Sequence, residues 1–164
     1  MDHEPGLYLE DLYVGQRFTS DSYRMGEEQI KAFAAEFDPQ PFHLDQAAAQ
    51  ATVFGGLCAS GWHTAAVAMR LMVTGGLPLG NGIIGLGGEL AWPKPTRPGD
   101  TLRVESEILE IVPSRSKPNQ AVVKVKSTTL NQNGEPVHMF AAKLLVFKRP
   151  SARSATTKTG PEVN

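Results

Sequence analysis

The second half of the chain alternates apolar and polar side chains in long runs. These runs are bounded by glycine, proline or asparagine and cover residues 83–92, 101–112, 120–130 and 137–147. A period of two is typical of strands with one buried face. The Asn133-Gly134 dipeptide favours a tight hairpin, and Pro98-Gly99-Asp100 marks a turn. The pattern therefore predicts four strands joined by antiparallel meander connections.

The first half of the chain shows mostly a helical period. Ile30, Phe33, Ala34 and Phe37 lie at the i, i+3, i+4, i+7 spacing of one helix face, and Asp38-Pro39 ends this helix. Upstream, residues 16–23 form a weak strand candidate, and downstream the alanine-rich residues 45–52 predict a short helix. This half is therefore expected to contribute one short strand and the helices.

A longer helix is predicted at residues 60–73, after the Phe54-Gly55-Gly56-Leu57 break. Its side chains are small or apolar, which suits close packing against a curved sheet. The side chains expected to face the sheet are Trp62, Ala65, Ala66, Met69 and Val73. One long helix followed by four strands predicts an α+β fold in which the sheet covers a buried central helix.

Composition indicates one compact domain. With 164 residues, of which 41% are hydrophobic and 20% charged, the chain is long enough to bury a sizeable core. We assign residues 1–150 to this domain and expect the polar residues 151–164 to form a disordered tail. The formal net charge of -1 provides no basic field for nucleic acid or for an anionic membrane, so neither is expected as a partner.

Cysteine usage and hydropathy favour a cytoplasmic protein. Cys58 is the only cysteine and cannot form an intrachain disulfide, and no apolar run follows the acidic N-terminus. The most apolar helical stretch, residues 64–73, is interrupted by Arg70 and falls short of the roughly 20 residues that a membrane span requires. No spacing of His, Cys or carboxylate residues predicts a metal site.

The candidate chemistry lies in Asp38-Pro39-Gln40-Pro41-Phe42-His43. A carboxylate and an imidazole stand five positions apart, in a segment that two prolines are expected to hold extended. Such a pair can share a water molecule and serve as acid and base. The residues alone leave a second interpretation open, because Asp before Pro also ends helices and a lone loop histidine is usually a surface group.

The order of elements and two motifs resemble the MaoC-like dehydratases, relatives of the (R)-specific enoyl-CoA hydratases, over about residues 8–148. The family signature of Asp, Asn, Pro and His maps in turn onto Asp38, Gln40, Pro41 and His43, and the Asp, Pro and His positions match. The Pro-Gly-Asp turn before a long strand appears as Pro98-Gly99-Asp100. The resemblance implies a hot-dog fold, in which an antiparallel sheet wraps a long central helix.

The family resemblance also implies the reaction. Water would add to a trans-2-enoyl-CoA thioester, or leave a (R)-3-hydroxyacyl-CoA thioester, with Asp38 and His43 activating it in roles that remain open. Backbone amides at Gly55 or Gly56 would stabilise the thioester oxygen. Coenzyme A is part of the substrate, so no separate cofactor is expected, and Lys94, Arg97, Arg115 and Lys117 are candidates for its phosphates. The resemblance implies a lyase of acyl-CoA and fatty acid metabolism. It also implies a homodimer or a higher multiple of dimers.

Some residues depart from the family pattern or have open roles. Gln40 replaces the usual asparagine, so it is a possible substrate-binding residue with longer reach. Ser60 and His63 follow the glycine break and are further possible substrate-binding residues, although Ser60 is equally suited to begin a helix. Two alternative functions stay open, namely a hot-dog acyl-CoA thioesterase and a non-catalytic acyl-CoA-binding subunit.

Overall fold

A computed structural model describes residues 6–151, so all but the first residue of the predicted disordered tail lies outside the described part. Its centre is an antiparallel sheet of six strands in the path order β1-β4-β5-β6-β3, with β2 also pairing with β4. The strands are β1 (Arg17–Thr19), β2 (Tyr23–Arg24), β3 (Ile84–Ala91), β4 (Thr101–Pro113), β5 (Gln120–Leu130) and β6 (Pro136–Phe147). The four long strands of the second half are therefore confirmed.

The connectivity is less simple than a meander. Strands β4, β5 and β6 do form one, but β3 pairs with β6 and not with β4, its successor in the chain. The chain therefore crosses from one edge of the sheet towards the other between β3 and β4. Residues 92–100 make this crossing. They pass beside the first turn of the helix that begins at Gly61, where the Trp92 indole N–H donates a hydrogen bond to the Gly61 carbonyl.

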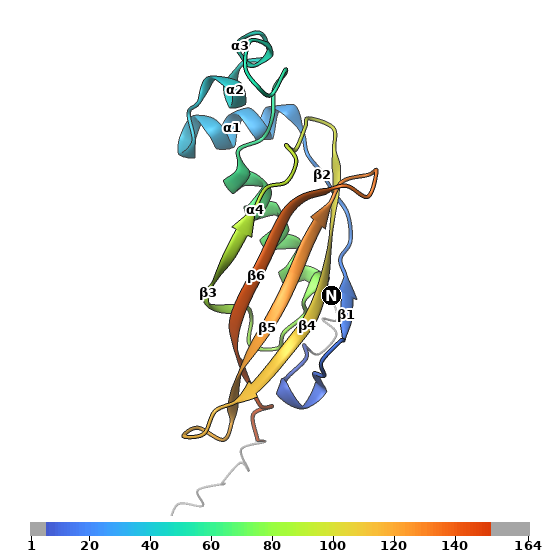
Figure 1. The fold of residues 1–164 in the computed structure, drawn as a ribbon, viewed down its shortest axis with the longest axis vertical. Helices are drawn as coiled ribbons and strands as arrows, with labels where there is room; N and C mark the ends of the chain where they lie inside the picture. The colour runs from blue at the N-terminus through green and yellow to red at the C-terminus, as the bar shows by residue number, and fades with distance from the viewer. Residues whose placement is uncertain (1–5, 152–164) are drawn as a thin grey trace, which may run out of the picture.

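The helices lie in two places (Figure 1). The helical elements are η1 (Leu9–Asp11), α1 (Glu27–Phe37), α2 (Pro41–Leu44), α3 (Gln46–Gln50), α4 (Gly61–Leu71) and the π-helical turn η2 (Met72–Gly76). Helices α1, α2 and α3 gather at one end of the sheet, whereas α4 lies along one sheet face. Among residues 6–151, no helix is long and apolar enough to cross a membrane.

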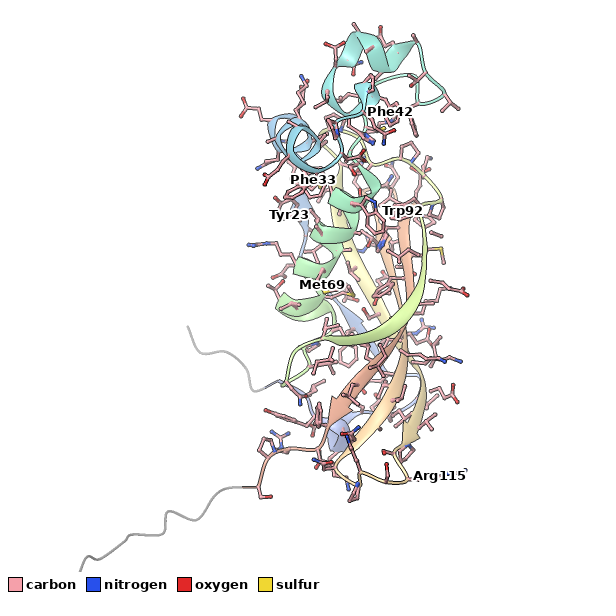
Figure 2. All side chains as sticks on the ribbon, turned by 90° about the vertical axis from the view of Figure 1, so that its left-hand side faces the viewer. Tyr23, Phe33, Phe42, Met69, Trp92 and Arg115 are labelled. Atoms are coloured by element: carbon pink, nitrogen blue, oxygen red, sulfur yellow. The ribbon has the colours of Figure 1, made fainter. Side chains whose placement is uncertain are left out.

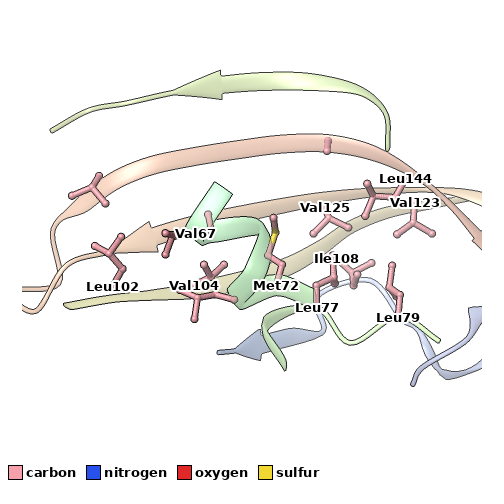
Figure 3. Close-up of a cluster of buried hydrophobic side chains, with 14 of the residues drawn as sticks. Val67, Met72, Leu77, Leu79, Leu102, Val104, Ile108, Val123, Val125 and Leu144 are labelled. Atoms are coloured by element: carbon pink, nitrogen blue, oxygen red, sulfur yellow. The ribbon is translucent and has the colours of Figure 1, made fainter. Parts of the chain in front are cut away.

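The core lies between α4 and the sheet (Figure 3). The alternation of β4 places Leu102, Val104 and Ile108 on the inner face, each at most 1% exposed. They pack with Val67 from α4 and Met72 from η2 in one cluster of buried residues. Burying a side chain of this size stabilises the fold by about 1.5–3 kcal/mol. The period-two pattern of β4 thus separates a buried face of the sheet from a more exposed one.

Helix α4 presents the opposite face from the one predicted. The residues expected to face the sheet include Trp62, Met69 and Val73, which are 58%, 38% and 55% exposed. The buried face instead carries His63, Thr64, Val67, Ala68 and Leu71. Both faces of the helix are rich in apolar residues, so hydrophobic period alone does not choose between them. Among residues 6–151, the other apolar face remains largely uncovered.

Candidate active site

Asp38 and His43 form a close pair at the end of the sheet where α1, α2 and α3 gather. The His43 Nε2 atom lies 3.3 Å from Asp38 Oδ2, and both side chains are largely shielded from solvent, being 6% and 17% exposed. Asp38 follows the last residue of α1 with a non-helical backbone, and His43 lies within α2. The pair predicted from the spacing is therefore brought together.

The segment that carries this pair is less extended than predicted. Asp38 and Gln40, which precede the two prolines, are indeed non-helical, but Pro41 opens the helical turn α2. Proline is well tolerated at the first helical position because its missing N–H would have no intrahelical partner there. The turn brings the His43 side chain back towards Asp38, whereas a fully extended segment would carry it away.

The tautomer of His43 follows from its surroundings. Its Nδ1 atom lies 2.7 Å from the backbone carbonyl oxygen of Cys58. A carbonyl oxygen only accepts, so Nδ1 carries the proton. In the neutral imidazole the Nε2 lone pair then points to the side where Asp38 lies. Both members of the pair can therefore accept a hydrogen bond from the same water molecule.

Asp38 is held as a carboxylate. Burial is the largest single influence on its pKa and acts to raise it. Hydrogen bonds from Ser60 and Gln40, together with the electrostatic effect of His43, outweigh burial and hold the pKa below its ordinary value. The Gln40 Nε2 atom donates to Asp38 Oδ1 at 2.7 Å. Gln40 and Ser60, both predicted as possible substrate-binding residues, thus contact the catalytic candidate itself.

The pair opens into a pocket of about 390 Å³ between α2, the start of α4 and the β3–β4 crossing. Most of its walls are apolar or aromatic with a few polar groups among them, as is usual for pockets that bind small molecules. The lining side chains include Asp38, Gln40, Phe42, His43, Phe54, Cys58, Trp62, Thr64, Trp92, Lys94 and Thr96. A larger hollow of about 620 Å³ lies over β3 and β6 and contains neither Asp38 nor His43.

The glycines predicted to donate to the thioester oxygen, Gly55 and Gly56, do not share the pocket of Asp38 and His43. The N–H of Gly55 donates to the Thr52 carbonyl at 3.0 Å, and neither Gly55 nor Gly56 lines the pocket. Gly61 does line it, and as the first residue of α4 its N–H has no carbonyl partner within the helix. A Cβ at Gly61 would lie 2.9 Å from the Trp92 ring, so glycine is needed for this close packing. Sequence reasoning missed Gly61, since only its neighbour Ser60 was considered, as a possible substrate-binding residue or helix start.

The other predicted site residues lie around or away from the pocket. His63 is buried and stacks on Phe33 with 4.7 Å between ring centroids, outside the pocket lining. Lys94 lines the pocket and pairs with Glu135. Arg115 lies at the opposite end of the molecule from Phe42 and Trp92 (Figure 2). Of the four cations suggested for the phosphates of coenzyme A, only Lys94 lines this pocket.

Cys58 contributes its backbone carbonyl, and its thiol is not activated. The Sγ atom lies 3.7 Å from His43 Nδ1. Burial raises the pKa of the thiol, and the positive charge of Arg97 offsets this only in part. A protonated thiol is a poor nucleophile, so covalent thiol chemistry is disfavoured. Over residues 6–151, no group of three or more His, Cys, Asp or Glu side chains is arranged to hold a metal ion.

Two buried histidines predict acid sensitivity. Burial lowers the pKa of both His63 and His138 below the ordinary value. In the unfolded chain both histidines titrate at about pH 6.5, so below that pH the unfolded chain binds more protons than the folded one. The free energy of unfolding should therefore fall as pH drops from about 6.5 towards 5. Asp38 acts in a separate window, because its lowered pKa places any loss of stability below about pH 4.

Urea unfolding followed by circular dichroism at several pH values measures this effect. The single variants His63→Leu and His138→Leu should each flatten the pH dependence. A slope unchanged in both variants would contradict the assignment.

Comparison with known proteins places this chain in a family. A model of the MaoC like domain matches residues 13–131. The crystal structure of a MaoC-like dehydratase from Rhodospirillum rubrum is 62% identical, with a TM-score of 0.88, and the match covers 89% of this chain and all of that one. The R-hydratase PhaJ1 of Pseudomonas aeruginosa is 30% identical at a TM-score of 0.70, covering 88% of each chain.

A relative with a named activity agrees with these structures. The 3-hydroxybutyryl-CoA dehydratase of Methylorubrum extorquens is 33% identical over 116 residues, which are 68% of this chain and 69% of the relative. The antiparallel sheet with one helix along its face is the hot-dog fold of these neighbours. This chain therefore belongs to the MaoC-like hydratase and dehydratase family.

Proposed function

We propose that this protein is a hydro-lyase that adds water to a trans-2-enoyl-CoA, or removes it from a (R)-3-hydroxyacyl-CoA. One observation carries the proposal. Asp38 and the Nε2 atom of His43 lie 3.3 Å apart at the wall of a largely apolar pocket. Both accept hydrogen bonds, so a water held between them donates both of its hydrogens and keeps its lone pairs for attack. The relatives named as hydratase and dehydratase support this assignment.

The proposed step moves one water across the double bond. The water oxygen bonds to the β-carbon while His43 Nε2 accepts one of its protons, and the alkene electrons move towards the thioester oxygen. The Asp38 carboxylate orients the water and stabilises the imidazolium. The same proton then returns to the α-carbon, which restores neutral His43. No electron is transferred to another group, and we propose no cofactor beyond the coenzyme A of the substrate.

We assign the stabilisation of the thioester oxygen to the N–H of Gly61. This group lies at the N-terminus of α4, where the helix dipole favours developing negative charge. Gly61 lines the same pocket as Asp38 and His43. The Trp92 indole donates to the Gly61 carbonyl at 2.9 Å and so helps to hold this residue in place. The Gly55 amide, already bonded to Thr52, is the weaker candidate.

One assay tests the function. The protein is incubated with crotonyl-CoA and with longer enoyl-CoA thioesters, while the enoyl absorbance and the release of free thiol are both followed. Loss of the enoyl absorbance without thiol release is the expected result. Thiol release would indicate a thioesterase, and binding without either change would indicate a non-catalytic acyl-CoA-binding subunit. Either of these outcomes contradicts the proposal.

We also propose that two copies associate through β3 and the uncovered face of α4. Strand β3 pairs only with β6 in the described chain, and all eight of its residues are exposed. An unpaired edge is a template for another strand, and a closed two-fold pairing would cover it. The exposed apolar residues Met69 of α4 and Val73 of η2 would be buried by the same association.

Light scattering after size-exclusion chromatography should therefore give a dimer or a multiple of it at micromolar concentration. Met69→Glu with Val73→Glu should shift the protein towards monomers, because the substitutions place charge on the surface to be buried. Val112→Glu is the control, since Val112 is 49% exposed at the end of β4. A monomeric wild-type protein would refute the association.

A further inference from the structure

We propose that Arg97 is a positioning residue for His43, which it serves by holding the loop that carries the Cys58 carbonyl. This inference rests on the proposed roles of Asp38 and His43 but adds a residue that does not belong to that pair. Arg97 lies in the β3–β4 crossing, remote in sequence from both.

The Arg97 guanidinium binds backbone carbonyls. Its NH1 atom donates to the Gly56 carbonyl at 2.8 Å and to the Leu57 carbonyl at 3.3 Å, and its NH2 atom donates to the Phe54 carbonyl. Among the ion pairs of residues 6–151, none includes this side chain. A charged side chain is therefore used to satisfy three acceptors of one loop.

This loop needs such a partner. Residues 56–60 are buried but belong to no helix or strand, so their backbone groups have no regular ladder to join. Buried carbonyls without a partner are costly, and the planar fork of an arginine can satisfy several at once. The Gln46 side chain completes the arrangement by accepting from the Leu57 N–H at 2.8 Å.

Cys58, which follows Leu57 in this loop, orients His43. The Cys58 N–H donates to the Phe42 carbonyl at 3.1 Å, and the Ala59 N–H donates to the Thr96 carbonyl at 2.9 Å. Thr96 and Arg97 therefore hold the loop on both sides of the residue Cys58. The Cys58 carbonyl held in this way fixes the Nδ1–H tautomer of His43, and with it the direction of the Nε2 lone pair.

The competing role for Arg97 is a direct contact with a phosphate of coenzyme A. The two roles predict different kinetics. Loss of a phosphate contact raises KM and leaves kcat unchanged, whereas loss of a positioning residue lowers kcat. We expect Arg97→Met to lower kcat by up to about 100-fold, the scale of a 1 Å misplacement of a reacting group. KM should change much less.

A spectroscopic measurement separates this role from the enzymatic activity. Nitrogen-15 NMR of the histidine rings at mildly alkaline pH should show His43 as the Nδ1–H tautomer in the wild type. A mixture of tautomers is expected in Arg97→Met. The His43→Asn variant identifies the signal. If the wild type shows this tautomer but hydrates no enoyl-CoA, the proposed function fails and the positioning role stands.

Chemical rescue and two further variants complete the test. Millimolar guanidinium should restore part of kcat to Arg97→Ala, and Arg97→Lys should retain an intermediate kcat because a lysine reaches fewer carbonyls. Arg149→Met is the control, since Arg149 also links distant segments through Asp11. An unchanged His43 tautomer with unchanged kcat in Arg97→Met would overturn the inference. So would variants at Arg97 that simply fail to fold, which would assign Arg97 to stability.

Discussion

Replacing Asp38 by Asn should lower kcat for enoyl-CoA hydration by about 10²- to 10⁴-fold, the range typical of a lost acid or base group. The amide has the shape of the carboxylate but lacks its charge, and one of its two polar atoms donates. It therefore cannot accept from Gln40 and from the water as the carboxylate does. It also cannot stabilise an imidazolium on His43.

The measurement is the initial rate of loss of enoyl absorbance, with circular dichroism to show that the variant is folded. Asp21→Asn is a matched control, because it makes the same chemical change at an exposed position. Turnover by Asp38→Asn within a factor of three of the wild type would show that this carboxylate is not part of the mechanism.

Strong local patterns made much of the fold predictable. In β4 and β5, buried and exposed residues alternate along most of the strand, so a period-two pattern marks both. The short helix α3 has an equally local signal, since the Asp45 side chain caps it by accepting from the Ala48 N–H at 2.7 Å. These signals lie within a few residues of the element that they specify.

The features that sequence analysis missed depend on distant partners. The pairing of β3 with β6 is set by which edge of the sheet is free, and nothing in residues 84–91 records it. The face of α4 that becomes buried is likewise chosen by the sheet, because Met69 and Val67 are similarly apolar but point to opposite sides. Periodicity identifies the helix without giving its rotation.

In the candidate site, roles carried by side chains could be predicted from the sequence, whereas roles carried by backbone atoms could not. Asp38 and His43 could be proposed because a carboxylate and an imidazole are chemically distinctive side chains and stand close together in the sequence. The roles proposed for Gly61 and Cys58 rest on an N–H and a carbonyl, which almost every residue has, so no residue type marks them. Arg97 was noticed for its charge and assigned to phosphate, whereas its contacts are with the carbonyls of one loop. Roles carried by backbone atoms emerge only from the fold.

Replacing His43 by Asn should lower kcat for hydration to a similar degree as the change at Asp38 but leave the protein stable. The asparagine amide nitrogen reaches about as far as Nδ1, so it can still donate to the Cys58 carbonyl. The Nε2 acceptor, however, is lost, and with it the group that takes the proton of the water. We expect kcat to fall by about 10²- to 10⁴-fold.

The comparison with His43→Ala separates catalysis from folding. Alanine removes both ring nitrogens, so the buried Cys58 carbonyl loses its partner, at a cost of about 1–3 kcal/mol in the free energy of unfolding. Both variants should therefore be inactive, while only His43→Ala should unfold at a lower urea concentration. Activity in His43→Asn above one tenth of the wild type would mean that Nε2 is not the base. Asp38, the only other acceptor of the pair, would then have to take the proton from water itself.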